Sequence, residues 1–184
     1  MRIIDWVHSA ATGSRSRRQR LTPVGLLIFG GSLLLTVFGG LLLDRTLGLP
    51  RLFPGIPGRI LGYGLFGLGS VLCAWCVWRF LKSRGTPVPV NPPDELIIEG
   101  AYRWMRNPML TGVITALFGL GVILHSTAMA LISTPLYILA HVIELKLVEE
   151  PELERRFGPS YLDYKRRVPM FLPSLRRGRR NRSD

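Results

Sequence analysis

The chain has 184 residues, a formal net charge of +12 and a mean hydropathy of +0.25, with 47% hydrophobic residues. The length fits a single domain, residues 1–184, but the composition excludes a typical soluble domain. Lysines and arginines flank apolar runs and have no aromatic-basic module beside them, so no nucleic-acid partner is expected. The apolar runs predict an all-α polytopic membrane protein with about four transmembrane helices.

Residues 1–20 are predicted to form a cytoplasmic or interfacial segment that includes a short amphipathic helix. The first two transmembrane helices are expected at residues 21–43 and 60–81, joined by a loop rich in Pro and Gly. Small residues recur along one face of the second helix, where another helix or a ligand can approach: Gly62, Gly69, Cys73 and Cys76. An apolar helix does not activate thiols, so these cysteines indicate buried small residues and neither a redox nor a metal site.

Four prolines within residues 82–98 predict a stiff extended segment that leads back to the membrane surface. The next stretch, residues 100–112, reads G-A-Y-R-W-M-R-N-P-M-L-T-G. Its N-P pair marks a helix start at Asn107, and the free N–H groups of that start attract an anion. Arg103 and Arg106 add positive charge beside it. The pattern fits a site for a carboxylate or phosphate, or a loop whose arginines face lipid phosphates.

The third and fourth transmembrane helices are expected at residues 108–124 and 127–150 as a hairpin, with a kink at Pro135. Residues 151–184 are predicted to be a cytoplasmic segment with short helices and a break at Gly158. Aromatic side chains recur there at helical spacing and are placed to cap a pocket: Phe157, Tyr161 and Tyr164.

Acidic residues crowd the end of the fourth helix. In a regular helix, Glu144 and Glu149 flank His141 on one half of the surface, while Lys146 and Glu150 point away. Because the hairpin brings the arginine-bearing helix start to the same membrane surface, opposite charges should converge there. The convergence indicates either interfacial salt bridges or a pocket for a zwitterion.

Most basic residues lie before the first helix, between the second and third, and after the fourth, and a minority lies between the first and second: Arg45, Arg51 and Arg59. The positive-inside rule therefore predicts cytoplasmic termini, in the inner (cytoplasmic) membrane of a bacterium. A small transporter subunit is one alternative, but it should carry an ionisable residue at mid-membrane, and helices one to three have none. A non-catalytic membrane scaffold is the other alternative, and the sequence leaves the oligomeric state open.

Several motifs occur in a fixed order: G-A-Y-R at residues 100–103, R-N-P-M at 106–109, Gly112, E-E-P at 149–151 and F-G at 157–158. This series resembles the isoprenylcysteine carboxyl methyltransferase and phospholipid methyltransferase superfamily over about the C-terminal 100 residues. Gly67-Leu68-Gly69, N-P-M and E-E-P are also similar in order and spacing to the phosphatidylethanolamine N-methyltransferase branch.

The resemblance implies S-adenosylmethionine as methyl donor and S-adenosylhomocysteine as product, with the donor between the R-N-P helix start and the paired glutamates. The donor-binding residues are then Gly67, Gly69, Gly100, Tyr102, Arg103, Arg106, Asn107, Pro108, Met109, Gly112, His141, Glu149 and Glu150. An ammonium acceptor must lose a proton, whereas a carboxylate needs no base. The candidates for a catalytic role are His141, Glu144 and Arg106.

Three positions depart from the carboxyl methyltransferase pattern. Asn107 and Leu110 stand where that pattern has His and Tyr, and Met170 stands where relatives often have Arg. We therefore expect a lipid or lipid-like acceptor drawn from the membrane, above all a phospholipid head-group amine. A carboxyl group of the isoprenylcysteine type is the alternative.

Overall fold

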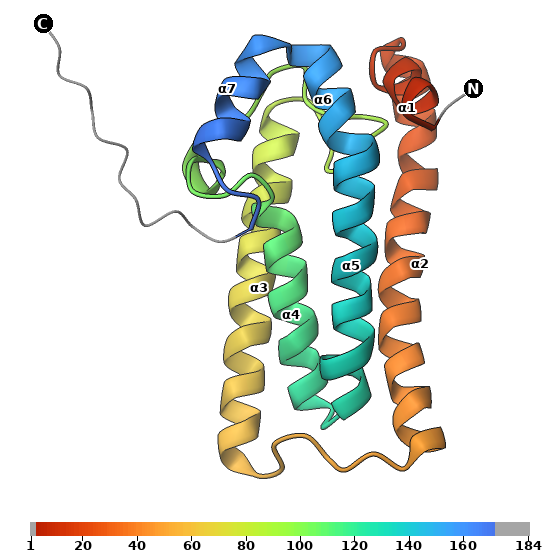
Figure 1. Ribbon diagram of the computed structural model, residues 1–184, viewed down its shortest axis with the longest axis vertical. Coiled ribbons are helices and arrows are strands. Elements are labelled where there is room, and N and C mark those ends of the chain that lie inside the picture. The colour runs from red at the N-terminus through yellow and green to blue at the C-terminus, as the bar shows by residue number, and fades with distance from the viewer. Residues whose placement is uncertain (1–2, 172–184) are drawn as a thin grey trace, which may run out of the picture.

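The computed structural model describes residues 3–171, and this part of the chain consists of helices and loops without a strand. The helices are α1 (Ile3–Ala11), α2 (Arg15–Leu47), α3 (Ile56–Lys82), α4 (Pro108–Ile123), α5 (Thr134–Glu144), α6 (Glu150–Phe157) and α7 (Pro159–Arg167). Helices α2 to α5 form a bundle, and α1, α6 and α7 gather at one end of it (Figure 1). The all-α fold class is confirmed, and residues 172–184 of the predicted C-terminal segment lie outside the described residues.

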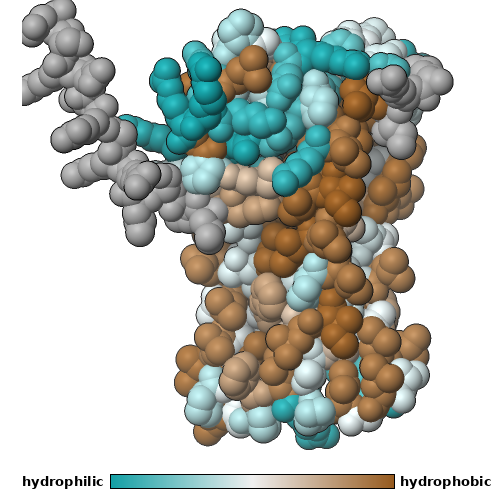
Figure 2. All heavy atoms as spheres, viewed as in Figure 1, coloured by the Kyte–Doolittle hydropathy of each residue, from teal (hydrophilic) through white to brown (hydrophobic). Residues whose placement is uncertain are grey.

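The bundle has the dimensions of a membrane protein. α2, α3 and the continuous helix Met129–Phe157 are long and apolar enough to cross a membrane. α4 is shorter, with 16 residues, which corresponds to about 24 Å. Hydrophobic side chains predominate along the length of the helix bundle, and hydrophilic ones gather at the end that carries α6 and α7 (Figure 2). The chain is an integral membrane protein, and we call this hydrophilic end the polar end.

α3 and α4 make the most extensive contact in the bundle, because glycines let their backbones touch. A Cβ atom on Gly69 would lie 2.4 Å from the carbonyl oxygen of Gly112 and 2.5 Å from the backbone nitrogen of Ala116. Gly62 and Gly119 meet in the same way further along the helices. At Gly62 and Gly69, the small-residue face predicted on the second helix is therefore filled by α4 and has no room for a ligand.

The predicted hairpin of the third and fourth helices forms, with its turn at residues 124–126. Asp44, near the end of α2, fastens this turn because its carboxylate accepts hydrogen bonds from the Ser126 hydroxyl and from the Ala128 N–H, the latter at 2.8 Å. The start of α4 and the end of the fourth helix consequently lie at the same, polar end (Figure 1).

The fourth helix contains two π-helical turns, η2 (Met129–Ser133) and η3 (Leu145–Glu149). Each ends two residues before a proline, Pro135 or Pro151. A proline lacks an N–H and its ring crowds the carbonyl four residues back, and a wider π turn relieves both problems without ending the helix. The helix thus passes through Pro135 and Pro151 and ends at Phe157, where the predicted break at Gly158 is confirmed.

Candidate active site

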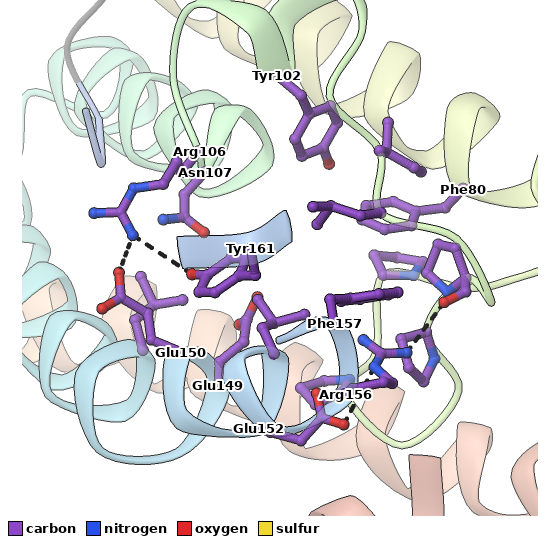
Figure 3. Close-up of a pocket in the computed structure, with 18 of the residues that line it drawn as sticks. Phe80, Tyr102, Arg106, Asn107, Glu149, Glu150, Glu152, Arg156, Phe157 and Tyr161 are labelled. Atoms are coloured by element: carbon purple, nitrogen blue, oxygen red, sulfur yellow. Dashed lines mark hydrogen bonds and ion pairs between the residues drawn. The ribbon is translucent and has the colours of Figure 1, made fainter. Parts of the chain in front are cut away.

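A cavity lies at the polar end, between the α6–α7 pair and the loop of residues 83–107 (Figure 3). It encloses about 840 Å³ of space, counting the part that is open to solvent, which is within the range of small-molecule sites. Its wall contains five aromatic side chains, four acidic residues and two arginines: Phe80, Tyr102, Phe157, Tyr161, Tyr164, Glu95, Glu149, Glu150, Glu152, Arg106 and Arg156. The rest of the wall comes from residues 86–97, which include four prolines, from Asn107, Leu145 and Leu153, and from Val7 of α1.

Arg106 and Glu150 form a buried ion pair on one side of the cavity, with 11% and 7% of their side chains exposed. Lys165 of α7 contacts the same carboxylate at 2.7 Å. The Arg106 guanidinium also reaches the Tyr161 hydroxyl at 3.5 Å and donates to the Val168 carbonyl at 3.0 Å. The carboxylate of Glu150 is therefore neutralised within the protein, so it is not placed to neutralise a ligand.

This pairing corrects the prediction that Glu150 points away from the charged surface. The π turn η3 inserts about one residue into the turn before Glu150, which rotates everything after it relative to a regular helix. Glu150 consequently faces Arg106, whereas Lys146 is exposed, as the regular spacing predicts.

The start of α4 is partly occupied by the chain that follows α7. The backbone N–H of Arg106 donates to the Pro169 carbonyl at 2.8 Å, and that of Asn107 to the Met170 carbonyl at 3.0 Å. Asn107 precedes the helix without a side-chain capping bond, and its amide lines the cavity (Figure 3). Of the predicted anion site, Arg106 and Asn107 line the cavity, and Arg106 is already paired with Glu150.

Glu149 differs sharply from its neighbour Glu150. It makes no hydrogen bond or ion pair with another residue of the described chain, and its carboxylate lies inside the cavity near Tyr161 and Phe157 (Figure 3). When it is ionised, a carboxyl group among aromatic faces attracts a cation by charge, and the ring quadrupoles add to the attraction. The cavity therefore suits a positively charged ligand.

The tyrosines of the cavity are hydrogen-bond donors and not bases. Burial raises the pKa of Tyr161 to about 12 and raises the pKa values of Tyr102 and Tyr164 well above the ordinary range. All three hydroxyls therefore keep their protons at neutral pH. The Tyr164 hydroxyl donates to the Tyr102 carbonyl at 2.7 Å and so joins α7 to the loop before α4.

Two residues predicted to take part in catalysis lie outside the cavity. The His141 ring packs in the helix bundle, with its centroid 4.3 Å from that of Tyr137 and 6.4 Å from that of Phe29. Glu144 is half-buried one turn nearer the polar end. Both belong to the helix before the π turn η3, so their positions do not follow the rotation that brings Glu150 to Arg106.

Several predicted donor-binding residues also lie outside the cavity wall: Gly67, Gly69, Gly100, Arg103, Pro108, Met109 and Gly112. Gly69 and Gly112 serve the α3–α4 contact, whereas Gly67 faces open space. Gly100 has a φ of +59° and faces the Trp75 ring, where a Cβ would lie 2.4 Å from the nearest ring atom. Arg103 is exposed, and Pro108 is buried as the first residue of α4.

Sequence reasoning missed part of the cavity wall. Arg156 and Glu152 contact each other at 3.3 Å, and Arg156 also donates to the Pro93 carbonyl at 3.1 Å. The proline-rich segment, predicted only to lead back to the membrane surface, forms part of the cavity wall. The feature of the sequence that could have indicated this role is its position shortly before the R-N-P motif. Among residues 3–171, no cluster of three or more His, Cys, Asp or Glu could hold a metal.

An apolar groove of about 930 Å³ runs between α2 and the α3–α4 pair. Ser70 and Cys73 are the polar side chains among the residues that line it: Phe29, Leu33, Val37, Phe66, Ser70, Cys73, Val77, Met109, Val113, Ala116, Leu117 and Leu120. Two residues of the groove are close in sequence to residues of the cavity wall. Val77 is about one helical turn from Phe80, and Met109 is two residues from Asn107. The groove therefore leads from the membrane-spanning part toward the polar end.

Residues 57–160, more than half of the chain, match the phospholipid methyltransferase family. The chain belongs to this family. In this phospholipid methyltransferase family member, the matched region covers α3, α4, the fourth helix and the start of α7. It includes every charged residue that lines the cavity, whereas Tyr161 and Tyr164 of the wall lie beyond it.

Three curated relatives align with 60 to 65% of the chain. It is 31% identical over 112 residues to methanethiol S-methyltransferase of Mycobacterium tuberculosis and 33% identical over 113 residues to methanethiol S-methyltransferase 2 of Bradyrhizobium diazoefficiens. It is 28% identical over 122 residues to the nickel-cobalt-cadmium resistance protein NccN of Alcaligenes xylosoxydans xylosoxydans. The alignments span 39%, 38% and 53% of these relatives, respectively, and no solved structure matches the chain.

Proposed function

We propose that this protein is an S-adenosylmethionine-dependent methyltransferase of the membrane, with the donor bound in the cavity at the polar end. The observation that carries the proposal is the Glu149 carboxylate, which lies without a protein partner among aromatic side chains. A donor with a sulfonium and an ammonium group fits such a wall. Membership of the phospholipid methyltransferase family supports the same reaction class.

When bound, the donor supplies an activated methyl group. Glu149 would hold its ammonium or ribose hydroxyls, and the Asn107 amide its carboxylate. Glu149 should not press against the sulfur, because the sulfonium loses charge in the transition state and a carboxylate there would favour the reactant. Arg106 and Glu150 would act by positioning: their pair holds the cavity wall together. The buried side chains around them exclude water, which leaves positioning as the main source of catalysis.

For the acceptor we propose an amphiphile whose hydrocarbon chain lies in the apolar groove, with a phospholipid head-group amine at the cavity. The groove has almost no polar lining. An aliphatic chain can therefore enter it from the bilayer without losing hydrogen bonds, whereas a polar molecule would lose its hydrogen bonds to water. The amine must give up a proton, and the three cavity tyrosines are protonated already. Because Glu149 is assigned to the donor, the remaining candidates for the base are Glu144 and His141, which lie outside the cavity.

A small apolar thiol is a second candidate acceptor, favoured by the names of two relatives. It would need no chain-binding groove. The purified protein should be incubated with methyl-labelled donor and native membrane extract, and separately with methanethiol. Base-stable label in the lipid fraction supports amine methylation, base-labile volatile label indicates a carboxyl ester, and label only in dimethyl sulfide supports the thiol. Failure of S-adenosylhomocysteine to bind in calorimetry would leave a scaffold or transporter subunit and end the enzyme proposal.

We further propose that the polar end faces the cytoplasm, since its arginines satisfy the positive-inside rule. A cysteine placed at Thr46, in the last turn of α2 at the opposite end, should react with a membrane-impermeant thiol reagent added outside intact cells. A cysteine placed at Ser160 of α7 should react only after the cells are opened. The reverse labelling pattern would invert the orientation.

A further inference from the structure

Part of the cavity is open to solvent, and its walls differ in how firmly the rest of the protein holds them. The α7 wall is fixed by the Lys165–Glu150 contact at 2.7 Å and by the hydrogen bond from Tyr164 to the Tyr102 carbonyl. The backbone pairing of Arg106 with Pro169 anchors the chain that follows α7. These contacts are buried or half-buried, and together they make α7 a poor candidate for opening.

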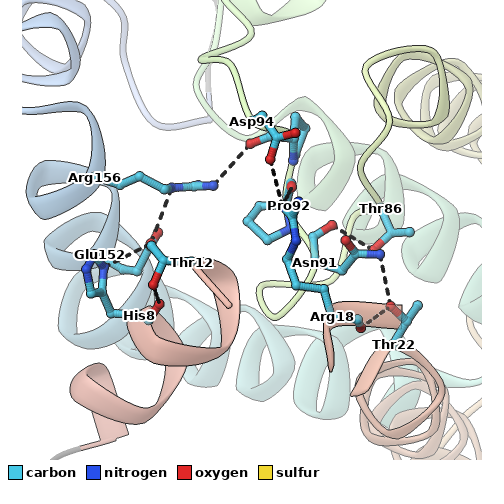
Figure 4. Close-up of polar contacts among 11 residues, drawn as sticks. His8, Thr12, Arg18, Thr22, Thr86, Asn91, Pro92, Asp94, Glu152 and Arg156 are labelled. Carbon is cyan, nitrogen blue, oxygen red and sulfur yellow. Dashed lines mark hydrogen bonds and ion pairs between the residues drawn. The ribbon is translucent and has the colours of Figure 1, made fainter. Parts of the chain in front are cut away.

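The proline-rich wall is also fixed (Figure 4). The Asn91 amide donates to the Thr22 hydroxyl of α2 at 3.0 Å, and Arg18 of α2 binds the Asp94 carboxylate, which is 69% exposed, at 2.7 Å. Val88 packs against Gly25, where it would collide with any Cβ. The loop is therefore tied to the membrane-spanning helix α2.

α1 is held differently. Asp5 contacts Arg155 of α6 at 2.9 Å, and these side chains are 44% and 46% exposed, so water screens the pair. His8 lies 3.5 Å from Glu152, a longer contact that is an ion pair when His8 is protonated (Figure 4). Between these two contacts, Val7 is buried and lines the cavity. α1 is thus a wall of the cavity fastened by comparatively weak charge contacts.

The connection between α1 and α2 is short and contains a glycine at position 13. Ala10, in the last turn of α1, is fully buried and packs in a small cluster with Val88 and Val90 of the fixed loop. Turning about residues 12–14 would lift Val7 from the cavity and break this small cluster, while the larger core between the membrane-spanning helices stays intact.

We propose that α1 is a movable lid: it undocks from α6 about residues 12–14 to admit and release the cavity's ligand, and docks again through Asp5–Arg155 and His8–Glu152. That the ligand is S-adenosylmethionine rests on the proposed function, whereas the movement of α1 is a property of the protein alone. The two can therefore fail separately.

The first test reverses one fastening charge that does not line the cavity. Arg155→Asp places like charges together, and Asp5→Arg with Arg155→Asp restores the pair in reverse as the matched control. Without ligand, amide hydrogen exchange in residues 3–11 should rise at least about three-fold in the single variant and return in the double variant. Association and dissociation rates of S-adenosylhomocysteine should rise together, with Kd changed less than about two-fold.

The second test locks the lid. Cysteines at Ala10 and Val88, which pack together, should form a disulfide on mild oxidation and slow S-adenosylhomocysteine association at least about ten-fold, reversibly on reduction. Wild-type protein given the same oxidant is the control for Cys73 and Cys76. Unchanged association in the locked protein, or unchanged hydrogen exchange in Arg155→Asp, overturns the lid. If the wild-type protein does not bind S-adenosylhomocysteine, the assignment of the donor is overturned. The hydrogen-exchange result, obtained without ligand, then still tests whether α1 moves.

Discussion

Replacing Glu150 by Gln should destabilise the protein, whereas replacing Glu149 by Gln should weaken ligand binding. The two glutamates are adjacent in sequence, and motif reasoning gave both to the donor. In the structure, Glu150 neutralises the buried Arg106 and contacts Lys165, while Glu149 has no such partner. The same chemical change at two neighbouring positions therefore tests the site with its own internal control.

The magnitudes follow from burial. Glu150→Gln leaves the Arg106 guanidinium without a counter-charge when it is only 11% exposed, and removing one partner of a buried pair costs about 3–5 kcal/mol. Replacing both partners by apolar residues, as in Arg106→Met with Glu150→Met, should recover most of that loss, since no uncompensated charge remains. Glu149→Gln loses a charge-assisted contact to the ligand, worth about 1.5–3 kcal/mol, or about ten-fold or more in Kd.

Thermal unfolding in detergent, followed by tryptophan fluorescence, measures the first effect, and calorimetry with S-adenosylhomocysteine measures the second. Glu150→Gln should lower the unfolding midpoint clearly, and Glu149→Gln should leave it near the wild-type value. The reasoning is refuted if Glu149→Gln destabilises the protein as much as Glu150→Gln, or if Glu150→Gln alone weakens binding at an unchanged midpoint. The first result would mean that Glu149 has a structural role, and the second that Glu150 is the ligand-binding carboxylate.

Three further outcomes are expected. Gly69→Ala should lower stability by about 1–3 kcal/mol, because its Cβ would lie 2.4 Å from a carbonyl oxygen of α4, whereas Gly67→Ala, which faces open space, should be nearly neutral in the same unfolding assay. Ser70→Phe should fill the apolar groove and lower methyl transfer to a long-chain amine at least about ten-fold, with S-adenosylhomocysteine affinity unchanged; equal loss with a small thiol would contradict a chain-binding role. The hydrogen bond from Arg18 lowers the pKa of Asp94. The stability from this pair is then present above the ordinary Asp pKa of about 3.9 and is lost as pH falls through the lower folded pKa, and Asp94→Asn should flatten the unfolding midpoint over that acid range.

Much of the fold could be predicted from the sequence because its determinants are local. A charge-free run of apolar residues has to become a helix in a bilayer, and an N-P pair before such a run marks where the helix starts, as α4 does at Pro108. The hairpin follows from the short turn at residues 124–126. The convergence of Arg106 with the glutamates follows from that hairpin, and the aromatic cap of α7 follows from helical spacing.

Other features depended on contacts between distant segments. Glycine spacing shows a close approach but not the partner, and only packing revealed that Gly69 meets α4 while Gly67 meets nothing. The docking of α1 on α6 joins residues about 150 positions apart, for which no local pattern exists. The sequence determined that four apolar helices bring arginines and carboxylates to one membrane surface. The tertiary structure decided which of the two adjacent glutamates in the cavity wall is paired, because the π turn before Pro151 rotates Glu150 onto Arg106 and leaves Glu149 without a protein partner.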